Sequence, residues 1–332
     1  MGGPGSTSLM KARALERLGH RVTVLNLQEC LPRNIWLRRL NNWTGYAVCQ
    51  TETAKFVAGR LVGQNYDVGW VDSGQMVGPR VVAALRKHAR HLVNYNHDDP
   101  TGARDGRAWG SFKRAAPLYD LLVTVRPETE AELKELGARQ VLRVWRSYDE
   151  VDHRPRDITP DDQVRWGSEV VFVGTWMPER GAFMAELVRR GVPLAIYGDF
   201  WPKADEWPEL RAAWRGPAVY GDDYAKAIQC SKIALGLLSK ENRDRHTTRS
   251  AEIPALGGLL CAERTDEHMQ LFVEGKEAVL WRDVSECEAQ CRALLSGDKR
   301  EEIRLCGEER VRALGIGNER ILDSVLRQVL HG

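Results

Sequence analysis

Short apolar runs alternate with amphipathic stretches along most of the chain. In the first half, strand-like runs lie at 68–71, 91–95, 120–125 and 140–145. Helical patterns lie at 79–89 and 127–136, and the second has Pro127 in its first turn and Gly137 after its end. This alternation predicts a parallel sheet covered by helices on both faces, with ligands bound at the carboxyl ends of its strands.

The alternation resumes after a polar, proline-containing stretch at 151–167, which we interpret as a linker. Strand-like runs then lie at 169–173, 193–197, 233–238 and 259–262. Helical patterns lie at 180–190, 220–230, 250–256, 285–295 and 299–330. We therefore expect two α/β domains, at 1–150 and 168–315, and a terminal helix at 316–332 that packs back on the first domain.

The start of the chain departs from the usual order of an α/β unit. A glycine-rich turn at 2–8 precedes a helical pattern at 9–18, and the spacing then predicts a strand at 22–27. Such a glycine loop ordinarily follows a strand, and here the first strand is missing, either because the sequence starts late or as a real departure. A polar, tryptophan-bearing connection at 28–65 leads to the next element.

Composition excludes some classes of protein. With 43% apolar and 28% charged residues the chain is globular, and 48 basic residues against 46 acidic ones give no case for a nucleic-acid partner. No apolar run approaches the roughly 20 residues that cross a bilayer, and the first residues lack a signal-peptide pattern. We expect a cytoplasmic protein that makes weak membrane-surface or polysaccharide contact through the basic patch at 36–39.

The seven cysteines include no Cys-x-x-Cys pair. Cys287 and Cys291 are one helical turn apart and could share a ligand, but no histidine pair accompanies them. Buried free thiols are therefore the favoured interpretation, and we expect no metal.

Candidate groups for binding a phosphate and a nucleotide base follow the first two strands of the second half. Gly174 and Thr175 close one strand, and Arg180 stands at the start of the next helix, where backbone N–H groups suit a phosphate. A plain connecting turn is the alternative. Tyr197 and Gly198 end the following strand, where an aromatic ring could stack on a base or pack within the loop.

A charged cluster precedes and opens the helix at 250–256. Lys240 and Asp244 follow a strand, Arg249 and Glu252 enter the helix, and Gly257 ends it. A carboxylate at 252 suits two ribose hydroxyls, and a guanidinium at 249 suits a diphosphate. The alternative is a solvated cluster whose charges pair with one another.

Polar groups also follow the strand at 91–95. His97 or Asp98 could orient or deprotonate an acceptor hydroxyl at the carboxyl edge of the sheet. A helix-capping role for an aspartate before Pro100 is equally open.

The segments at 231–258 and 267–283 resemble the carboxyl half of GT-B glycosyltransferases, and Gly3 to Ser8 with His97 to Pro100 resemble the amino half. The nearest resemblance is to the CgeB-like (spore maturation protein CgeB) branch of the family-4-like group. It implies an α/β GT-B fold of two Rossmann-like domains facing a central cleft.

The resemblance also implies roles for single residues. Gly3, Gly5, Ser6 and Thr7 would lie on the acceptor side. Glu252 matches the later glutamate of the family's E-x7-E pattern. Asp244 is an aspartate at the earlier position and would be a catalytic residue together with His97 and Asp98. Arg180 matches a basic residue near the diphosphate. Thr175 stands where many relatives have a second arginine. Neutralisation of the diphosphate charge would therefore fall to Arg249 and Lys240.

The resemblance implies a hexosyltransferase that moves a sugar from a nucleotide-diphospho-sugar to a hydroxyl of a glycan, lipid-linked or small-molecule acceptor. We expect retention and no cofactor or metal, since cations and helix N-termini can stabilise the leaving diphosphate and the chain has no D-x-D triplet. A nucleotide-sugar epimerase or hydrolase and a non-catalytic sugar-nucleotide-binding module are the alternatives. A nicotinamide dehydrogenase is disfavoured because only Glu29 could hold its ribose.

Overall fold

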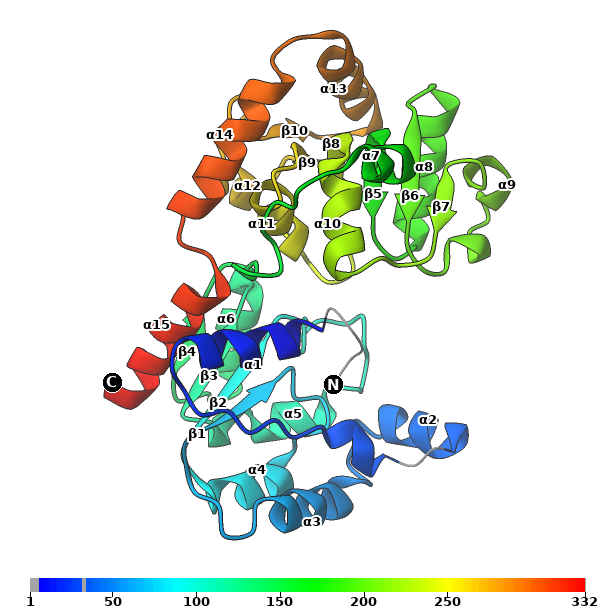
Figure 1. Cartoon of the computed structure of the whole chain (residues 1–332). Helices are drawn as coiled ribbons and strands as arrows, with labels where there is room; N and C mark the ends of the chain where they lie inside the picture. The colour runs from blue at the N-terminus through cyan, green and yellow to red at the C-terminus, as the bar shows by residue number, and fades with distance from the viewer. Residues whose placement is uncertain (1–5, 32–33, 332) are drawn as a thin grey trace. The chain divides into compact units, whose positions relative to one another are not determined.

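The computed structural model describes residues 6–31 and 34–331, which form two compact units (Figure 1). The N-terminal unit contains the chain up to Trp145, the segment Glu241–Arg243 and the chain from Glu319 onward. The C-terminal unit contains Arg146–Lys240 and Asp244–Asn318. Gly3 and Gly5 lie outside the described residues.

The N-terminal unit is built on a parallel sheet of strand order β1-β2-β3-β4. Its strands are β1 Tyr66–Asp72, β2 Ala89–Asn96, β3 Leu121–Thr124 and β4 Val141–Arg143. Its helices are α1 Thr7–Arg17, α2 Ile35–Trp43, α3 Gln50–Arg60, α4 Pro79–Arg86, α5 Gly110–Ala115, α6 Pro127–Glu135 and α15 Asn318–His331, with short 3-10 turns η1 Leu27–Cys30 and η2 Ala116–Leu118. The core includes the fully buried side chains of Leu92, Phe112 and Tyr119.

The strand expected at 22–27 is not formed, and this prediction was wrong. The segment pairs with no strand of the described sheet, Val24 is 44% exposed, and Asn26 caps η1 by accepting a hydrogen bond from the backbone N–H of Gln28. Alternating apolar residues make a strand only where a neighbouring strand satisfies the backbone N–H and C=O groups. The connection expected at 28–65 instead carries two helices, α2 and α3.

The C-terminal unit has a parallel sheet of order β10-β9-β8-β5-β6-β7. Its strands are β5 Ser168–Val173, β6 Leu194–Tyr197, β7 Trp214–Gly216, β8 Ser231–Gly236, β9 Leu260–Glu263 and β10 Val279–Trp281. Its helices are α7 Pro160–Trp166, α8 Pro178–Arg189, α9 Trp207–Leu210, α10 Gly221–Gln229, α11 Thr248–Ala255, α12 Asp266–Leu271, α13 Val284–Ser296 and α14 Arg300–Ala313, with a 3-10 turn η3 Trp201–Lys203. The predicted parallel sheets with alternating helices are confirmed.

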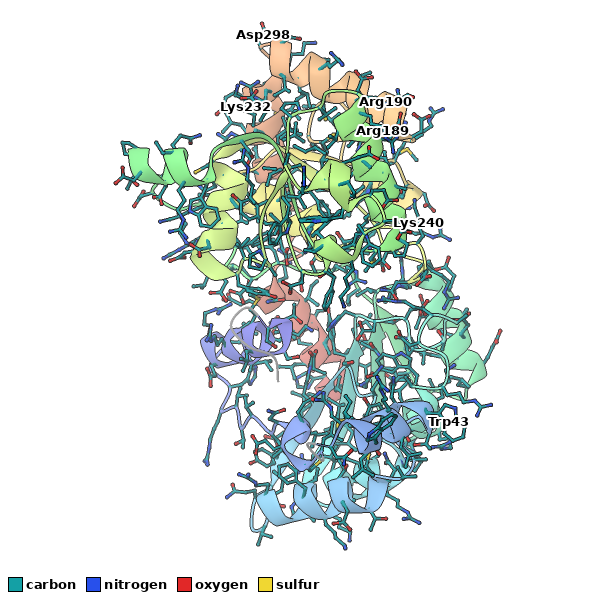
Figure 2. The ribbon with its side chains drawn as sticks, turned by 90° about the vertical axis from the view of Figure 1, so that its right-hand side faces the viewer. Trp43, Arg189, Arg190, Lys232, Lys240 and Asp298 are labelled. Atoms are coloured by element: carbon teal, nitrogen blue, oxygen red, sulfur yellow. The ribbon has the colours of Figure 1, made fainter. Side chains whose placement is uncertain are left out.

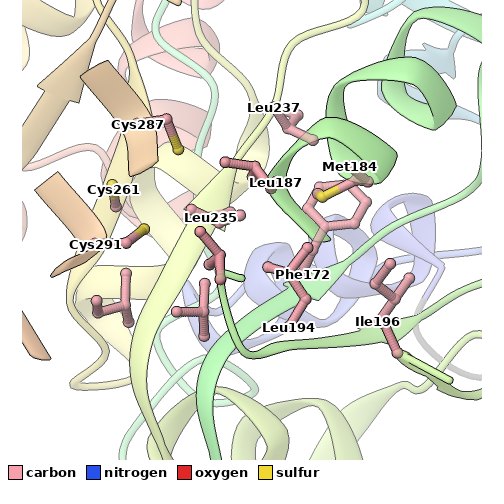
Figure 3. Close-up of a cluster of buried hydrophobic side chains, with 14 of the residues drawn as sticks. Phe172, Met184, Leu187, Leu194, Ile196, Leu235, Leu237, Cys261, Cys287 and Cys291 are labelled. Carbon is pink, nitrogen blue, oxygen red and sulfur yellow. The ribbon is translucent and has the colours of Figure 1, made fainter. Parts of the chain in front are cut away.

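The core of this unit lies under one face of its sheet. Phe172 from β5 and Leu235 from β8 pack with Met184 and Leu187 of α8 (Figure 3). Two cysteines of α13, Cys287 and Cys291, belong to the same apolar layer. Helices α10 and α11 contact strands of the sheet as well. Burial on both faces explains why the central strands read as continuous apolar runs in the sequence.

The stretch interpreted as a linker contains a packed helix. In α7, Thr159 and Asp162 form a reciprocal capping box, and the Trp166 ring lies 5.5 Å from the ring of Tyr197. Gln163 also donates a hydrogen bond to the carbonyl of Cys230. Residues 160–166 therefore belong to the C-terminal unit.

Candidate functional site

The strand order of the C-terminal unit reverses direction between β5 and β8. From β5 the chain adds β6 and β7 on one side, and it then returns to place β8, β9 and β10 on the other. In open parallel sheets, ligands bind outside the carboxyl ends of the strands at such a switch point. Gly174 and Thr175 follow β5 there, and the segment from Leu237 to Lys240 follows β8.

Two glycines bring the ends of β5 and β6 into contact. Gly198 has φ +155°, and a Cβ at this position would stand 1.9 Å from the carbonyl oxygen of Gly174. The same carbonyl accepts a 2.9 Å hydrogen bond from the indole N–H of the buried Trp201. Only glycine fits this approach, so both predicted glycines shape the loops above the switch point.

Arg180 joins the two strand ends. It lies in the first turn of α8, is 6% exposed, and donates to the carbonyl of Thr175 at 2.9 Å and to those of Leu237 and Leu238 at 3.4 Å. Its Nε is buried and has no hydrogen-bond partner among the described residues. Burial, and then the charge of Arg249, lower the pKa of Arg180 to about 10, so the side chain is a cation at neutral pH.

Arg249 supplies a second cation at the same place. From the first turn of α11 its Nε donates to the carbonyl of Val173, at the end of β5, and its Nη2 lies 3.6 Å from the position of a Cβ on Gly174. The two guanidinium groups repel each other beside the buried glycine loop. A bound anion between them would offset this repulsion. The geometry therefore matches a phosphate or diphosphate group.

Glu252 lies one helical turn after Arg249 and is buried. It accepts a 2.9 Å hydrogen bond from the Tyr224 hydroxyl, and its other oxygen lies 3.8 Å from Nε2 of His153. The His153 Nδ1 accepts from the backbone N–H of Asp149, which leaves Nε2 as the ring nitrogen on the side of Glu252. Burial, and then the negative charge of Glu252, raise the pKa of Tyr224.

Lys240 and Asp244 are engaged in ion pairs. Lys240 pairs with Glu263, which also accepts from the backbone N–H of Leu238. Asp244 accepts from the guanidinium of Arg146 at 2.9 Å, and both side chains are largely buried. The structure thus gives both residues structural partners near the site.

The remaining predicted donor residues lie in different surroundings. Thr175 is exposed beside Gly174, whereas Tyr197 is buried against Trp166. Gly257 has φ +76° and ends α11, where its carbonyl accepts from Arg304. An eight-residue helix is about 12 Å long, so Gly257 stands about that far from the first turn that carries Arg249.

A second polar cluster lies at the carboxyl edge of the N-terminal sheet. Asp98 accepts a 3.1 Å hydrogen bond from the Ser73 hydroxyl, and its backbone N–H donates to Asn96. Asp72, the last residue of β1, accepts from Lys11 at 2.7 Å and from Ser8. Burial opposes ionisation of Asp72, but Lys11 and His97 outweigh it and hold its pKa below the usual range.

Helix α1 brings Ser8 and Lys11 to this cluster. Ser6 is its N-cap residue and Thr7 its first residue, and neither side chain caps it. The sequence interpretation missed Lys11 and Asp72. A lysine on the buried side of α1 and an aspartate directly after a strand were the available signals.

Three thiols meet in the core of the C-terminal unit. The sulfur atoms of Cys261, Cys287 and Cys291 lie within 4.8 Å of one another, and all three residues are fully buried (Figure 3). Among the described residues this is the group of histidine, cysteine and acidic side chains whose spacing suits a metal ion. It belongs to the apolar layer under the sheet, together with Phe172 and Leu235.

Within the described parts of the chain, no helix combines the length and apolarity that crossing a membrane requires.

Comparisons with known proteins agree with this geometry. Residues 180–321 match a family model described as "Glycosyl transferase-like", a span that includes Arg180, Arg249 and Glu252. No curated protein sequence matches the chain.

Solved structures share the fold at low identity. HepE from Anabaena, solved with UDP and glucose, has 12% identity and a TM-score of 0.68, over 99% of this chain and 97% of that one. Sucrose-phosphate synthase from Thermosynechococcus elongatus has 13% identity and a TM-score of 0.62, over 84% and 78%. These likenesses show the fold. The predicted α/β GT-B fold is confirmed, as is the prediction of a glycosyltransferase at the level of its glycosyltransferase-like domain.

Proposed function

We propose that this glycosyltransferase of the GT-B type transfers a hexose from a nucleotide-diphospho-sugar to an acceptor hydroxyl, with retention and without a metal ion. The observation that carries the proposal is the arginine pair at the switch point. Arg180 and Arg249 bring two cations to one glycine loop, and a buried Nε of Arg180 has no partner among the described residues.

The arginine pair suits the diphosphate. Cleavage of the sugar–phosphate bond leaves negative charge on the departing diphosphate, and positioned cations stabilise that charge most where water is excluded. Both arginines lie in the first turn of a helix, α8 or α11, whose N-terminal N–H groups add to the positive field. Arg180 and Arg249 would thus provide the neutralisation that many transferases obtain from a bound divalent ion.

Glu252 suits the ribose of the donor. The Tyr224 hydroxyl donates a hydrogen bond to one oxygen of its carboxylate, and carboxylate oxygens accept strong hydrogen bonds from hydroxyl groups. The solved HepE structure contains UDP, which supports a uridine nucleotide as the first donor to test.

The acceptor side of the reaction is assigned to the N-terminal unit. We propose that His97 or Asp98 orients the acceptor hydroxyl, with Ser6 and Thr7 at the start of α1 on the same side. Ser73, which donates to Asp98, and Lys11, which pairs with Asp72, support a prearranged polar surface there. We also propose that the chain belongs to the CgeB-like branch and acts on a glycan, lipid-linked or small-molecule acceptor.

Nucleotide binding by wild-type protein and two arginine variants tests the proposal. UDP and a panel of UDP-, GDP- and dTDP-sugars should raise the melting temperature of wild type, because they bind the folded state. Arg180→Met should weaken UDP binding by about 10- to 100-fold, since it removes charge-assisted hydrogen bonds. Arg189→Met in the same helix, where the arginine is exposed and pairs with Glu186 and Glu209, is the matched control (Figure 2).

The same panel separates the alternatives. No stabilisation by any nucleotide, or equal UDP affinity in Arg180→Met and wild type, would refute the proposed donor site. Release of free sugar or an epimer without an acceptor would indicate a hydrolase or epimerase. Saturable binding without turnover across an acceptor screen would indicate a non-catalytic module.

A further inference from the structure

Helix α2 of the N-terminal unit turns an apolar stripe to solvent. Trp36, Leu40 and Trp43 recur at i, i+4 and i+7, which places them on one face of the helix. Their exposed fractions are 70%, 42% and 65%. In this helix only Asn41 is buried, so the polar Asn41, and none of the large apolar side chains, packs into the body of the unit.

This orientation is the reverse of the usual one. An amphipathic helix of a globular protein ordinarily buries its apolar stripe in the core, because each large side chain gains free energy on leaving water. Ile35 and Leu37 of the same helix and Val48 after it are exposed as well. Figure 2 shows Trp43 on the outside of its unit. Exposed apolar side chains gathered on one face in this way are typical of an interaction surface.

The charged residues of α2 are both basic. Arg38 and Arg39 are exposed on α2, and the sequence from 30 to 51 contains no aspartate or glutamate. The guanidinium of Arg39 lies 5.2 Å from the Trp36 ring, and that of Arg107 lies 5.7 Å from the Trp43 ring. Arginines thus flank both tryptophans.

We propose that α2 is a docking surface for an anionic lipid membrane. Tryptophan rings favour the boundary between headgroups and acyl chains, and basic residues beside them are attracted to anionic lipids. Both features occur together here, with Trp36, Leu40 and Trp43 as the inserting face and Arg39 and Arg107, which lie beside the tryptophan rings, as the headgroup contacts. Helix α2 shares no residue with the proposed donor site, and this proposal does not depend on the proposed reaction.

The positive charge of the α2 arginines favours an anionic membrane, and not a second copy of the chain, as the partner of this face. In a symmetric dimer through this face, each helix would meet its own image, and the arginines of the two copies would approach one another with no acidic residue on α2 to pair with them. A surface of phosphate headgroups neutralises the same arginines. The proposal therefore commits to anionic lipid as the occupant.

Flotation with vesicles tests the proposal. Full-length protein should bind vesicles of phosphatidylcholine mixed with phosphatidylglycerol, bind phosphatidylcholine vesicles much less, and be released by salt. Trp36→Ser combined with Trp43→Ser should abolish binding. Arg39→Glu combined with Arg107→Glu should lower the affinity for these vesicles at least about 25-fold, since each arginine contributes a factor of about five.

Matched controls use residues of similar exposure elsewhere. Val62→Ser with Val164→Ser removes two exposed apolar side chains, and Arg211→Glu with Arg320→Glu makes the same change in net charge; both should bind like wild type. Melting temperatures of all variants verify folding. The proposal is overturned if wild type does not float, if it binds neutral vesicles equally, or if the controls lose binding to the same extent. It is also overturned if sedimentation shows a dimer that the tryptophan variant dissociates while lipid binding is absent.

Discussion

At the scale of single residues, Gly198 is constrained both by its own backbone and by its neighbour. Its φ of +155° is strained for other residues, and a Cβ would stand 1.9 Å from a backbone oxygen that cannot move as a side chain can. Gly216 has a φ of +158°, and a Cβ added there would meet no atom within 4 Å. The two glycines therefore differ in their neighbours and hardly in φ.

We predict that Gly216→Ala lowers the free energy of unfolding by about 1–3 kcal/mol, the cost of the backbone strain alone. Gly198→Ala should cost at least about 2 kcal/mol more, because the carbonyl of Gly174 must move. Urea unfolding of both variants measures the difference. Equal losses would show that the contact between the two loops is not retained in solution.

The carboxylate of Glu252 is the proposed contact of the ribose hydroxyls, and UDP affinity measures this contact. Glu252→Gln keeps the size of the side chain and removes the carboxylate, so UDP affinity should fall by about 1.5–3 kcal/mol if the ribose hydroxyls donate to it. Glu169→Gln, at the start of β5, is the matched control and should bind like wild type.

The contact can be located by changing the ligand as well. 2′,3′-Dideoxy-UDP lacks both hydroxyls, so calorimetry should show weaker binding to wild type and little further loss in Glu252→Gln. Fully additive losses would place the ribose away from Glu252.

At the scale of elements, α11 is held by a buried histidine. His268 of α12 donates through Nδ1 to the carbonyl of Glu263 at 2.6 Å, and its Nε2 accepts from the Ser250 hydroxyl at 2.7 Å. Ser250 in turn accepts from the backbone N–H of Thr247, the N-cap of the helix. The first turn of α11, which carries Arg249, is thus tied to the end of β9.

This network predicts a loss of stability in mild acid. Burial lowers the pKa of His268 to about 4, whereas a histidine in the unfolded chain has a pKa of about 6.5. As pH falls below about 6.5 the unfolded state gains a proton that the folded state does not, so the stability contributed by neutral His268 is lost between about pH 6.5 and 4. The total is on the order of 3 kcal/mol.

Thermal unfolding between pH 7 and 4 checks this prediction. His268→Gln should be less stable at pH 7 and show a shallower fall, and His20→Gln, at an exposed position, should keep the wild-type slope. An unchanged slope in His268→Gln would assign the acid sensitivity to other groups, such as His246, whose pKa burial also lowers.

At the scale of the whole molecule, the terminal helices belong to different units. Val311 of α14 and Val325 of α15 are both fully buried and lie on either side of a break between Ala313 and Asn318. Val311 is part of the C-terminal unit, and Val325 is part of the N-terminal one. In the N-terminal unit, Arg17 of α1 also pairs with Glu319 of α15.

We predict that each valine-to-alanine change weakens one unit. Val325→Ala should lower hydrogen-exchange protection in β1 to β4 by roughly 1–3 kcal/mol, and Val311→Ala should do the same in β5 to β10, because each removes buried methyl groups from one core. Each variant is the control for the other. Equal loss in both sheets would show that the chain unfolds as one cooperative unit.

Most of the regular elements, and the residues on which the proposed donor site rests, could be predicted from the sequence alone, but the segments at 22–65 and 151–167 could not. Continuous apolar runs between helices could belong only to a covered parallel sheet, since every buried strand must be apolar on both faces. Gly174, Arg180, Arg249 and Glu252 could be selected as candidates because each stands directly after a strand or within the first turns of a helix, where side chains reach the carboxyl edge.

The tertiary structure alone decided which polar residues pair. The Arg146–Asp244 and Lys11–Asp72 pairs join residues 98 and 61 positions apart, and the Tyr224 hydroxyl reaches Glu252 from another helix. The apolar alternation at 22–27 found no neighbouring strand, whereas the apolar stripe of α2 faces outward although its spacing is typical of a buried helix face. Spacing along one chain specifies which face a side chain is on, but whether another part of the chain covers that face depends on packing between distant segments.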